Sequence, residues 1–162
     1  MSLVSLDALQ EQETYEVVVG NGASCLAAIR AADYTWIDDP WITEHLLSSS
    51  SDASQTVRRL SVGMFGVFET RPTSSTHQVL TSLVALGWRP ATLSELVSFD
   101  LQCLVGKFYP YAVVGLGSLT GEHKGKALVA TTTRHGLMHS LHVDPIDRVW
   151  HASIHRFLAA QA

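Results

Sequence analysis

Histidine is the residue type in this chain best suited to chemistry, and six of its eight copies lie after residue 100. An imidazole can bind a metal ion or transfer a proton near neutral pH. Arg134 lies in the same stretch and could line a pocket together with these rings. We therefore take the following C-terminal residues as candidate binding residues: Arg134, His139, His142, His151 and His155.

The spacing of these histidines permits two interpretations. His151 and His155 are four residues apart, and Asp147 precedes His151 by four. On a helix these three side chains would share a face, with neighbours about 6 Å apart, whereas on a strand the two rings would be about 13 Å apart. His139 and His142 would lie on opposite faces of a strand. Because no strict ligand spacing is present, solvated surface histidines are the main interpretation, metal or proton chemistry is the alternative, and no metal site is predicted.

Other catalytic signatures are incomplete. The sequence Gly20-Asn21-Gly22 between an expected strand and an expected helix is like the start of a dinucleotide-binding loop. Cys25 stands where the third glycine belongs, and no acidic residue follows at the required offset, so a simple strand-to-helix turn is favoured. There is no Gly-x-Ser-x-Gly elbow, and neither cysteine has a nucleophile signature. We therefore predict no cofactor and assign no catalytic residue.

Two tryptophans give a separate indication of a binding surface. Trp36 and Trp41 flank a turn-rich segment that contains Asp38, Asp39 and Pro40. Aromatic side chains in a loop can anchor a partner protein. The alternative is that they cover the edge of the core, since tryptophan is highly buried on average.

Composition indicates one packed domain over residues 1–162. Apolar residues make up 46% of the 162 residues and charged residues 16%, which excludes a disordered chain. Residues 1–100 carry 12 acidic and 5 basic side chains, whereas residues 101–162 carry 3 and 6. The overall acidity disfavours nucleic-acid binding. There is no signal-peptide pattern and no apolar run long enough for a membrane span, and the two cysteines are isolated, so we expect a cytoplasmic protein without a membrane partner.

Local patterns predict an α+β fold with a mainly antiparallel sheet and three short helices. Two capping boxes, Ser75 with Gln78 and Thr92 with Glu95, begin two helices that a corner containing Pro90 connects. Residues 1–13 are expected to be loosely ordered, and the serine-rich residues 47–56 to form a mobile loop. The remaining expected elements are a helix at 24–32 and strands at 15–19, 57–68, 111–119, 126–133 and 137–143.

The tail over residues 145–160 shows helical spacing, but a resemblance favours a strand. The segment Gly87–Leu96, which reads GWRPATLSEL, resembles a pattern in small uncharacterised bacterial proteins. The chain end Arg156–Ala160 is similar to the ending of those proteins. This resemblance implies an α+β fold that closes with a C-terminal strand, and it implies no activity, ligand or cofactor.

Taken together, these patterns favour a small non-enzymatic binding or interaction domain. Its partner would be another protein or a second copy of the chain, which could meet through a strand edge or through the acidic and basic parts. One alternative is a metal-dependent or histidine-assisted enzyme that uses the C-terminal histidines. Another is an inhibitor or immunity-type protein that masks a partner with its acidic N-terminal part. The sequence indicates no particular small-molecule ligand.

Overall fold

The computed structural model describes residues 9–38, 40–49, 58–67, 73–104, 108–123, 126–135 and 137–161. Within these residues there are four helices and two sheets. The helices are α1 (Gly22–Ala31), α2 (Trp41–Ser49), α3 (Thr76–Ala85) and α4 (Leu93–Cys103). The strands are β1 (Leu9–Val19), β2 (Trp36–Ile37), β3 (Arg58–Val67), β4 (Thr73–Ser75), β5 (Trp88–Pro90), β6 (Tyr109–His123), β7 (Lys126–His135), β8 (Met138–Pro145), β9 (Val149–His151) and β10 (His155–Gln161).

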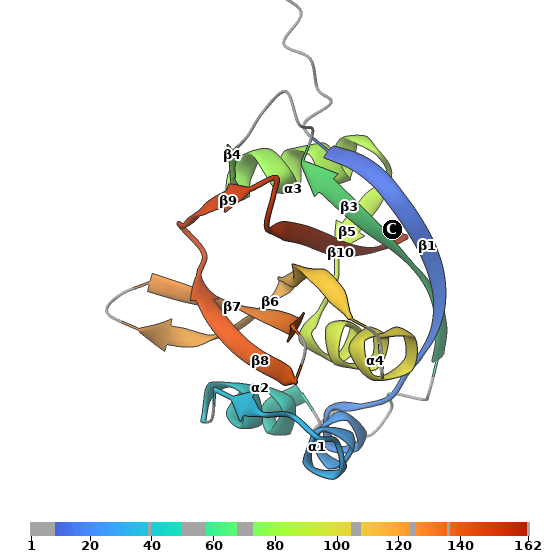
Figure 1. Ribbon diagram of the computed structural model, residues 1–162, viewed down its shortest axis with the longest axis vertical. Helices are drawn as coiled ribbons and strands as arrows, with labels where there is room; N and C mark the ends of the chain where they lie inside the picture. The colour runs from blue at the N-terminus through green and yellow to red at the C-terminus, as the bar shows by residue number, and fades with distance from the viewer. Residues whose placement is uncertain are drawn as a thin grey trace, which may run out of the picture.

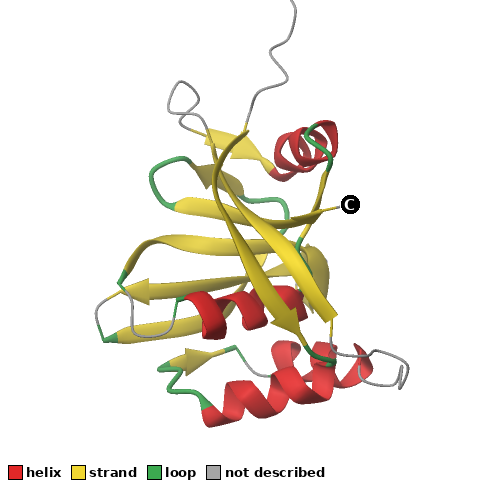
Figure 2. Ribbon diagram, turned by 90° about the vertical axis from the view of Figure 1, so that its right-hand side faces the viewer, coloured by secondary structure: helices red, strands yellow, loops and turns green. Residues whose placement is uncertain are grey.

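The main sheet is mixed and strongly curved. Its order is β1-β3-β10-β6-β7-β8-β2, with β5 paired to β10, and β4 and β9 form a separate pair. Most neighbouring strands are antiparallel, but β10 is parallel to β6 and β2 is parallel to β8. The sheet bends around α4, whereas α1 and α2 lie side by side at one end of the molecule and α3 lies at the other (Figures 1 and 2).

Two apolar clusters fill the two sides of this sheet. The larger one joins α1, α2 and α4 to the concave side, with fully buried residues such as Ile42, Leu46, Leu96 and Phe99. The smaller one lies beneath α3 and β9 and contains Trp150, which is fully buried. Because α4 contributes to the larger cluster along most of its length, the position of α4 is fixed by packing against several strands.

The prediction of an α+β fold is confirmed, but two details of it are wrong. The sheet is mixed rather than mainly antiparallel, because β10 runs parallel to β6 and β2 runs parallel to β8. The fourth helix, α2, was missed because the region was interpreted as a turn followed by a polar run. The spacing of Trp41, Ile42, His45 and Leu46 in fact gives one apolar helical face, and Pro40 directly precedes the helix.

The two predicted capping boxes are both present. Ser75 accepts from the Gln78 amide and Thr92 from the Glu95 amide, with the reciprocal bonds also formed. Gly87 has φ of 80°, as a residue that ends a helix in the left-handed conformation requires. The corner containing Pro90 is the short strand β5, rather than only a turn. The tail is β9, a turn and β10, so residues 155–161 form the closing strand that the resemblance favoured.

The end of β6 holds the start of α4. The Gly117 amide donates to the Ala91 carbonyl at 2.7 Å, and the Ser118 hydroxyl accepts from the Leu93 amide at 3.0 Å. A Cβ atom at Gly117 would lie 2.5 Å from the Pro90 carbonyl oxygen, which is too close for any other residue to fit without a backbone shift. Glycine at this position therefore allows β6 to approach the first turn of α4.

The two segments expected to lack regular structure lie partly inside elements. Of residues 1–13, those from Leu9 onward belong to β1, where they pair with β3, and residues 1–8 lie outside the described residues. Of residues 47–56, the first three belong to α2, and residues 50–56 lie outside the described residues. In the described part of the chain, every helix is too short or too polar to cross a membrane.

Candidate functional site

A buried polar cluster centred on Asp100 connects α4 to β7, β8 and the segment after α1. Asp100 is fully buried, and its two oxygens accept four side-chain hydrogen bonds. Arg134 donates to it from Nε at 2.9 Å and from Nη2 at 3.4 Å, His139 Nε2 lies 2.7 Å away, and the Tyr34 hydroxyl donates at 2.5 Å. We call Tyr34, Asp100, Arg134 and His139 the Asp100 cluster.

The electrostatics of the Asp100 cluster favour an ionised carboxylate. Burial alone would raise the pKa of Asp100, but the hydrogen bonds from His139, Arg134 and Tyr34 outweigh burial and hold this pKa below its usual range. Burial, together with the Asp100 charge and hydrogen bond, raises the pKa of Tyr34. Tyr34 therefore stays a hydroxyl donor, and Asp100 stays an acceptor.

The contact with Asp100 determines which ring nitrogen of His139 carries the proton. Because an ionised carboxylate can only accept, the proton must lie on His139 Nε2. In the neutral ring this leaves a lone pair on Nδ1, which is buried and has no hydrogen-bond partner among the described residues. The closest charged group is the carboxylate of Asp33, whose Oδ1 lies 3.7 Å from Nδ1.

The sequence contained a signal for Asp100 that the prediction missed. Asp100 follows Leu93, Leu96 and Val97 at the spacing that defines the inner face of α4, and a charged residue there must be buried with partners. Two of its partners, Arg134 and His139, were already candidates, and they face one another on paired strands. The structure thus brings these two candidates together, at a carboxylate that was not among them.

The Asp100 cluster fixes the short segment before α2 onto the edge of the sheet. The Tyr34 ring stacks on His139 with ring centroids 3.8 Å apart. The Thr35 amide donates to the His139 carbonyl at 2.6 Å, and the His139 amide donates to the Thr35 hydroxyl at 3.1 Å. Beyond β2, the Asp38 carboxylate accepts from the Val143 amide at 2.9 Å. The backbone on both sides of Trp36 is therefore fixed by hydrogen bonds.

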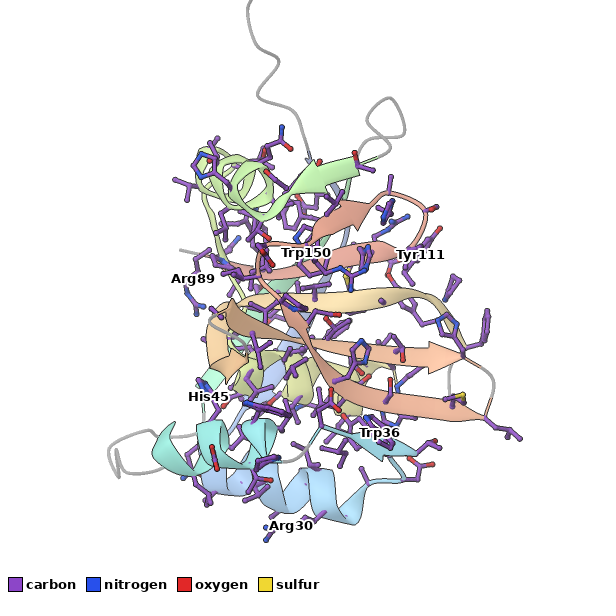
Figure 3. All side chains as sticks on the ribbon, turned by 90° about the vertical axis from the view of Figure 1, so that its left-hand side faces the viewer. Arg30, Trp36, His45, Arg89, Tyr111 and Trp150 are labelled. Carbon is purple, nitrogen blue, oxygen red and sulfur yellow. The ribbon has the colours of Figure 1, made fainter. Side chains whose placement is uncertain are left out.

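Trp36 belongs to a group of exposed apolar side chains at one end of the sheet, which we call the edge patch. Phe108 packs near His135, with ring centroids 6.2 Å apart, and His135 pairs with Met138. Trp36 pairs with Ser140, two residues further along β8, and projects from β2 (Figure 3). The patch consists of Trp36, Phe108, Leu137 and Met138, whose exposed fractions are 60%, 69%, 100% and 58%.

His142 lies on the opposite face of β8 from His139, as the spacing predicted. Its Nδ1 lies 3.2 Å from the Ser140 hydroxyl, and its Nε2 lies 3.5 Å from Asp144. Asp144 also accepts from Thr131 at 2.8 Å and from Arg148 at 2.6 Å. This row contains the residue types of a hydrolytic triad, but the Ser140 hydroxyl is bonded to Thr133. The side chains of Thr131, Thr133, Ser140, His142 and Asp144 bond mainly to one another. These bonds connect β7 to β8.

The remaining candidates lie apart from the Asp100 cluster. His151 and His155 flank a turn rather than one helix or strand, and their rings stack with centroids 6.2 Å apart. The His151 amide donates to His155 Nδ1 at 3.0 Å. Trp41 begins α2 and is half-buried, outside the edge patch. The described part of the chain contains no group of three or more metal-ligating side chains placed to share an ion.

The ring of His155 predicts a pH dependence of stability. Burial, together with the charge of Arg148, lowers the pKa of His155 to about 4. In the unfolded chain His155 binds a proton below a pKa of about 6.5, whereas in the folded chain it binds one only below about 4. The contribution of His155 to the free energy of unfolding is therefore complete above pH 6.5 and is lost as the pH falls toward 4. At about 1.4 kcal/mol per pKa unit, the loss is roughly 3 kcal/mol.

Urea denaturation across this pH range measures the effect. His155→Asn keeps an acceptor near the position of Nδ1 and removes the titration, so its free energy of unfolding should lack this component. His151→Asn changes the exposed neighbouring ring and should keep it. The pKa values of Asp100 and Asp144 are also lowered by folding, but these groups change the free energy of unfolding only below about pH 4, outside this pH range. An identical decline in wild type and His155→Asn would contradict the assignment.

With this geometry in place, the chain was compared with known proteins. No protein family, no curated protein and no solved structure matches it. We therefore infer the function from three features of the chain itself: a buried charged cluster, a segment that this cluster fixes to the sheet edge, and the exposed edge patch.

Proposed function

We propose that this chain is a small, non-enzymatic protein-interaction domain whose docking surface is the edge patch. The observation that carries the proposal is that four large apolar side chains are more than half exposed: Trp36 on β2, Met138 on β8, Phe108 directly before β6 and Leu137 directly before β8. Contiguous exposed apolar surface on a folded domain marks an interaction site more often than isolated exposed residues do. Tryptophan, in particular, is enriched among residues that dominate binding energy.

The rigidity of the surroundings supports the same proposal. A partner that binds Trp36 has less backbone to order on binding, because the Asp100 cluster and the Thr35–His139 bonds already hold most of the segment that carries it. Preorganisation of this kind increases affinity by lowering the entropic cost of binding. It also gives a functional interpretation to a buried charged cluster that is expensive to build from desolvated groups.

The size of the edge patch indicates the kind of partner. A stable interface between two folded proteins involves roughly 20–30 residues on each side, far more than this patch offers. The proposed occupant is therefore a short apolar segment of another protein, bound transiently, rather than a second copy of the chain. The alternative of a histidine-assisted enzyme has less support, because His139, His142 and His155 lie in three separate environments.

Selection of short random peptides on the full chain, followed by affinity measurements on variants, tests this proposal. Trp36→Ala removes a hot-spot side chain worth about 2 kcal/mol, so the dissociation constant should rise roughly thirtyfold. Leu137→Ala should weaken binding by a smaller factor. Val84→Ala is the control, since Val84 is also an exposed apolar residue but lies on α3, at the other end of the molecule (Figure 1).

Two results would overturn the proposal. The first is a set of selected peptides that bind Trp36→Ala as tightly as wild type. The second is a concentration-dependent dimer, seen by sedimentation velocity, that dissociates in Trp36→Ala. That result would show that a second copy of the chain occupies the patch.

A further inference from the structure

We propose that His139 and Asp33 form a proton-controlled latch on the segment Asp33–Ile37, which we call the docking segment. The latch is a property of the free chain. Its effect on partner binding rests on the function proposed above, since the docking segment carries Trp36. The proposal starts from one unsatisfied atom, Nδ1 of His139.

This atom is exceptional within an otherwise satisfied cluster. His139 is buried, and its Nε2 contacts Asp100 at 2.7 Å, yet its Nδ1 has no hydrogen-bond partner among the described residues. A buried polar atom without a partner is costly. The Asp33 carboxylate lies 3.7 Å away, just beyond hydrogen-bond distance, and its side chain is 98% exposed and able to rotate. A proton on Nδ1 would convert this near-contact into a charge-assisted hydrogen bond.

The charged groups around His139 come from three elements of the fold. The ring faces the Asp100 carboxylate on α4, the Arg134 guanidinium beside it on β7, and Asp33 and the Tyr34 hydroxyl on the docking segment. Helix α2, which also packs against β8, carries Glu44 and His45. Two carboxylates and one guanidinium leave a net charge of −1 around a neutral ring. An imidazolium brings the immediate set to zero.

Protonation leaves the Asp100 cluster intact and adds one bond. Nε2 donates to Asp100 in both states, because it carries a proton in both. Nδ1 changes from an unpaired acceptor to a donor, and Asp33 is the acceptor within reach. The docking segment, which is already bonded to the sheet and to α4 through Tyr34 and Thr35, then gains a hydrogen bond at its first residue, Asp33. Acidification that protonates Nδ1 of His139 should therefore reduce the mobility of the backbone that carries Trp36.

The effect on binding is modest and has a defined sign. Because Asp33 is exposed, the added ion pair is screened by solvent. We expect partner peptides to bind about twofold to fivefold more tightly at the lower pH. Asp33→Asn should remove this pH dependence. Glu44→Gln, which alters an exposed carboxylate on α2, should keep it.

Nitrogen NMR of the histidine rings in the free, full-length chain tests the latch directly. The expected result is that His139 Nε2 stays protonated throughout, and that Nδ1 gains a proton at a lower pH in Asp33→Asn than in wild type. The protection factors of the Thr35 and Trp36 amides, which correct for the slowing of all amide exchange at lower pH, should increase on acidification in wild type and in Glu44→Gln, and not in Asp33→Asn. Equal titration midpoints and equal protection factors in wild type and Asp33→Asn would overturn the latch.

This experiment separates the latch from the proposed function. The NMR and exchange measurements use no partner, so their failure overturns the latch while the edge patch keeps its role. Conversely, peptides that bind Trp36→Ala as tightly as wild type would overturn the docking function, even where the NMR comparison of wild type with Asp33→Asn supports the latch.

Discussion

Asp100→Asn is expected to destabilise the fold by about 3–5 kcal/mol, the usual effect of removing one partner from a buried ion pair. Asp100 is fully buried and is the common acceptor for Tyr34, Arg134 and His139. An asparagine keeps the shape but removes the negative charge, so the buried guanidinium of Arg134 loses its counter-charge. Urea denaturation at neutral pH, followed by circular dichroism, measures the change in the free energy of unfolding.

The matched control for Asp100→Asn is Asp33→Asn. Asp33 touches the same histidine but is almost fully exposed, so its substitution should change stability by less than about 1 kcal/mol. The expected contrast is therefore severalfold between two aspartates that contact the same ring. A loss of under 1 kcal/mol in Asp100→Asn would show that the Asp100 cluster does not hold α4 and the docking segment to the sheet.

Trp150→Ala is expected to destabilise the chain by about 3–5 kcal/mol through loss of buried surface and formation of a cavity. Trp150 is fully buried in the smaller apolar cluster. Its ring contacts those of His155 and Phe157, with centroids 5.0 and 5.7 Å apart. Its Nε1 donates to the Thr76 hydroxyl at 2.8 Å, which links β9 to the first turn of α3.

Trp150→Phe divides this effect into its two causes. Phenylalanine keeps most of the apolar volume but leaves the Thr76 hydroxyl without its donor, so the loss should be smaller than in Trp150→Ala. Both variants can be compared with wild type by urea denaturation. A value for Trp150→Ala within 1 kcal/mol of wild type would show that this cluster adds little to stability.

The sequence predicted the local structure where one short pattern determines it. The capping boxes at Ser75 and Thr92 and the left-handed Gly87 are such patterns, because each satisfies its own backbone groups over a few residues. The parallel pairing of β10 with β6 was not predictable in this way. It depends on where the chain end returns, and the helical spacing of the tail even suggested another structure.

The candidate site was predictable only in part for the same reason. His139 and Arg134 were chosen by residue type, and Trp36 by its aromatic character. What joins them is Asp100, which acts through tertiary contacts with strands more than thirty residues away in sequence. His151 and His155 show the opposite case, since a regular spacing suggested a helical pair and a turn decided the geometry. The resemblance of the Gly87–Leu96 segment to uncharacterised bacterial proteins stays a prediction.

Chemical-shift mapping of a selected peptide on the full-length chain tests the central claim most directly. We expect the largest chemical-shift changes on the Trp36 indole and on Phe108, Leu137 and Met138. A groove of about 270 Å³ between α1 and α4, lined by Val18, Cys25 and Leu101 among others, is a competing position on the same molecule. Changes centred on that groove, with the Trp36 indole unmoved, would contradict the assignment of the edge patch as the docking surface.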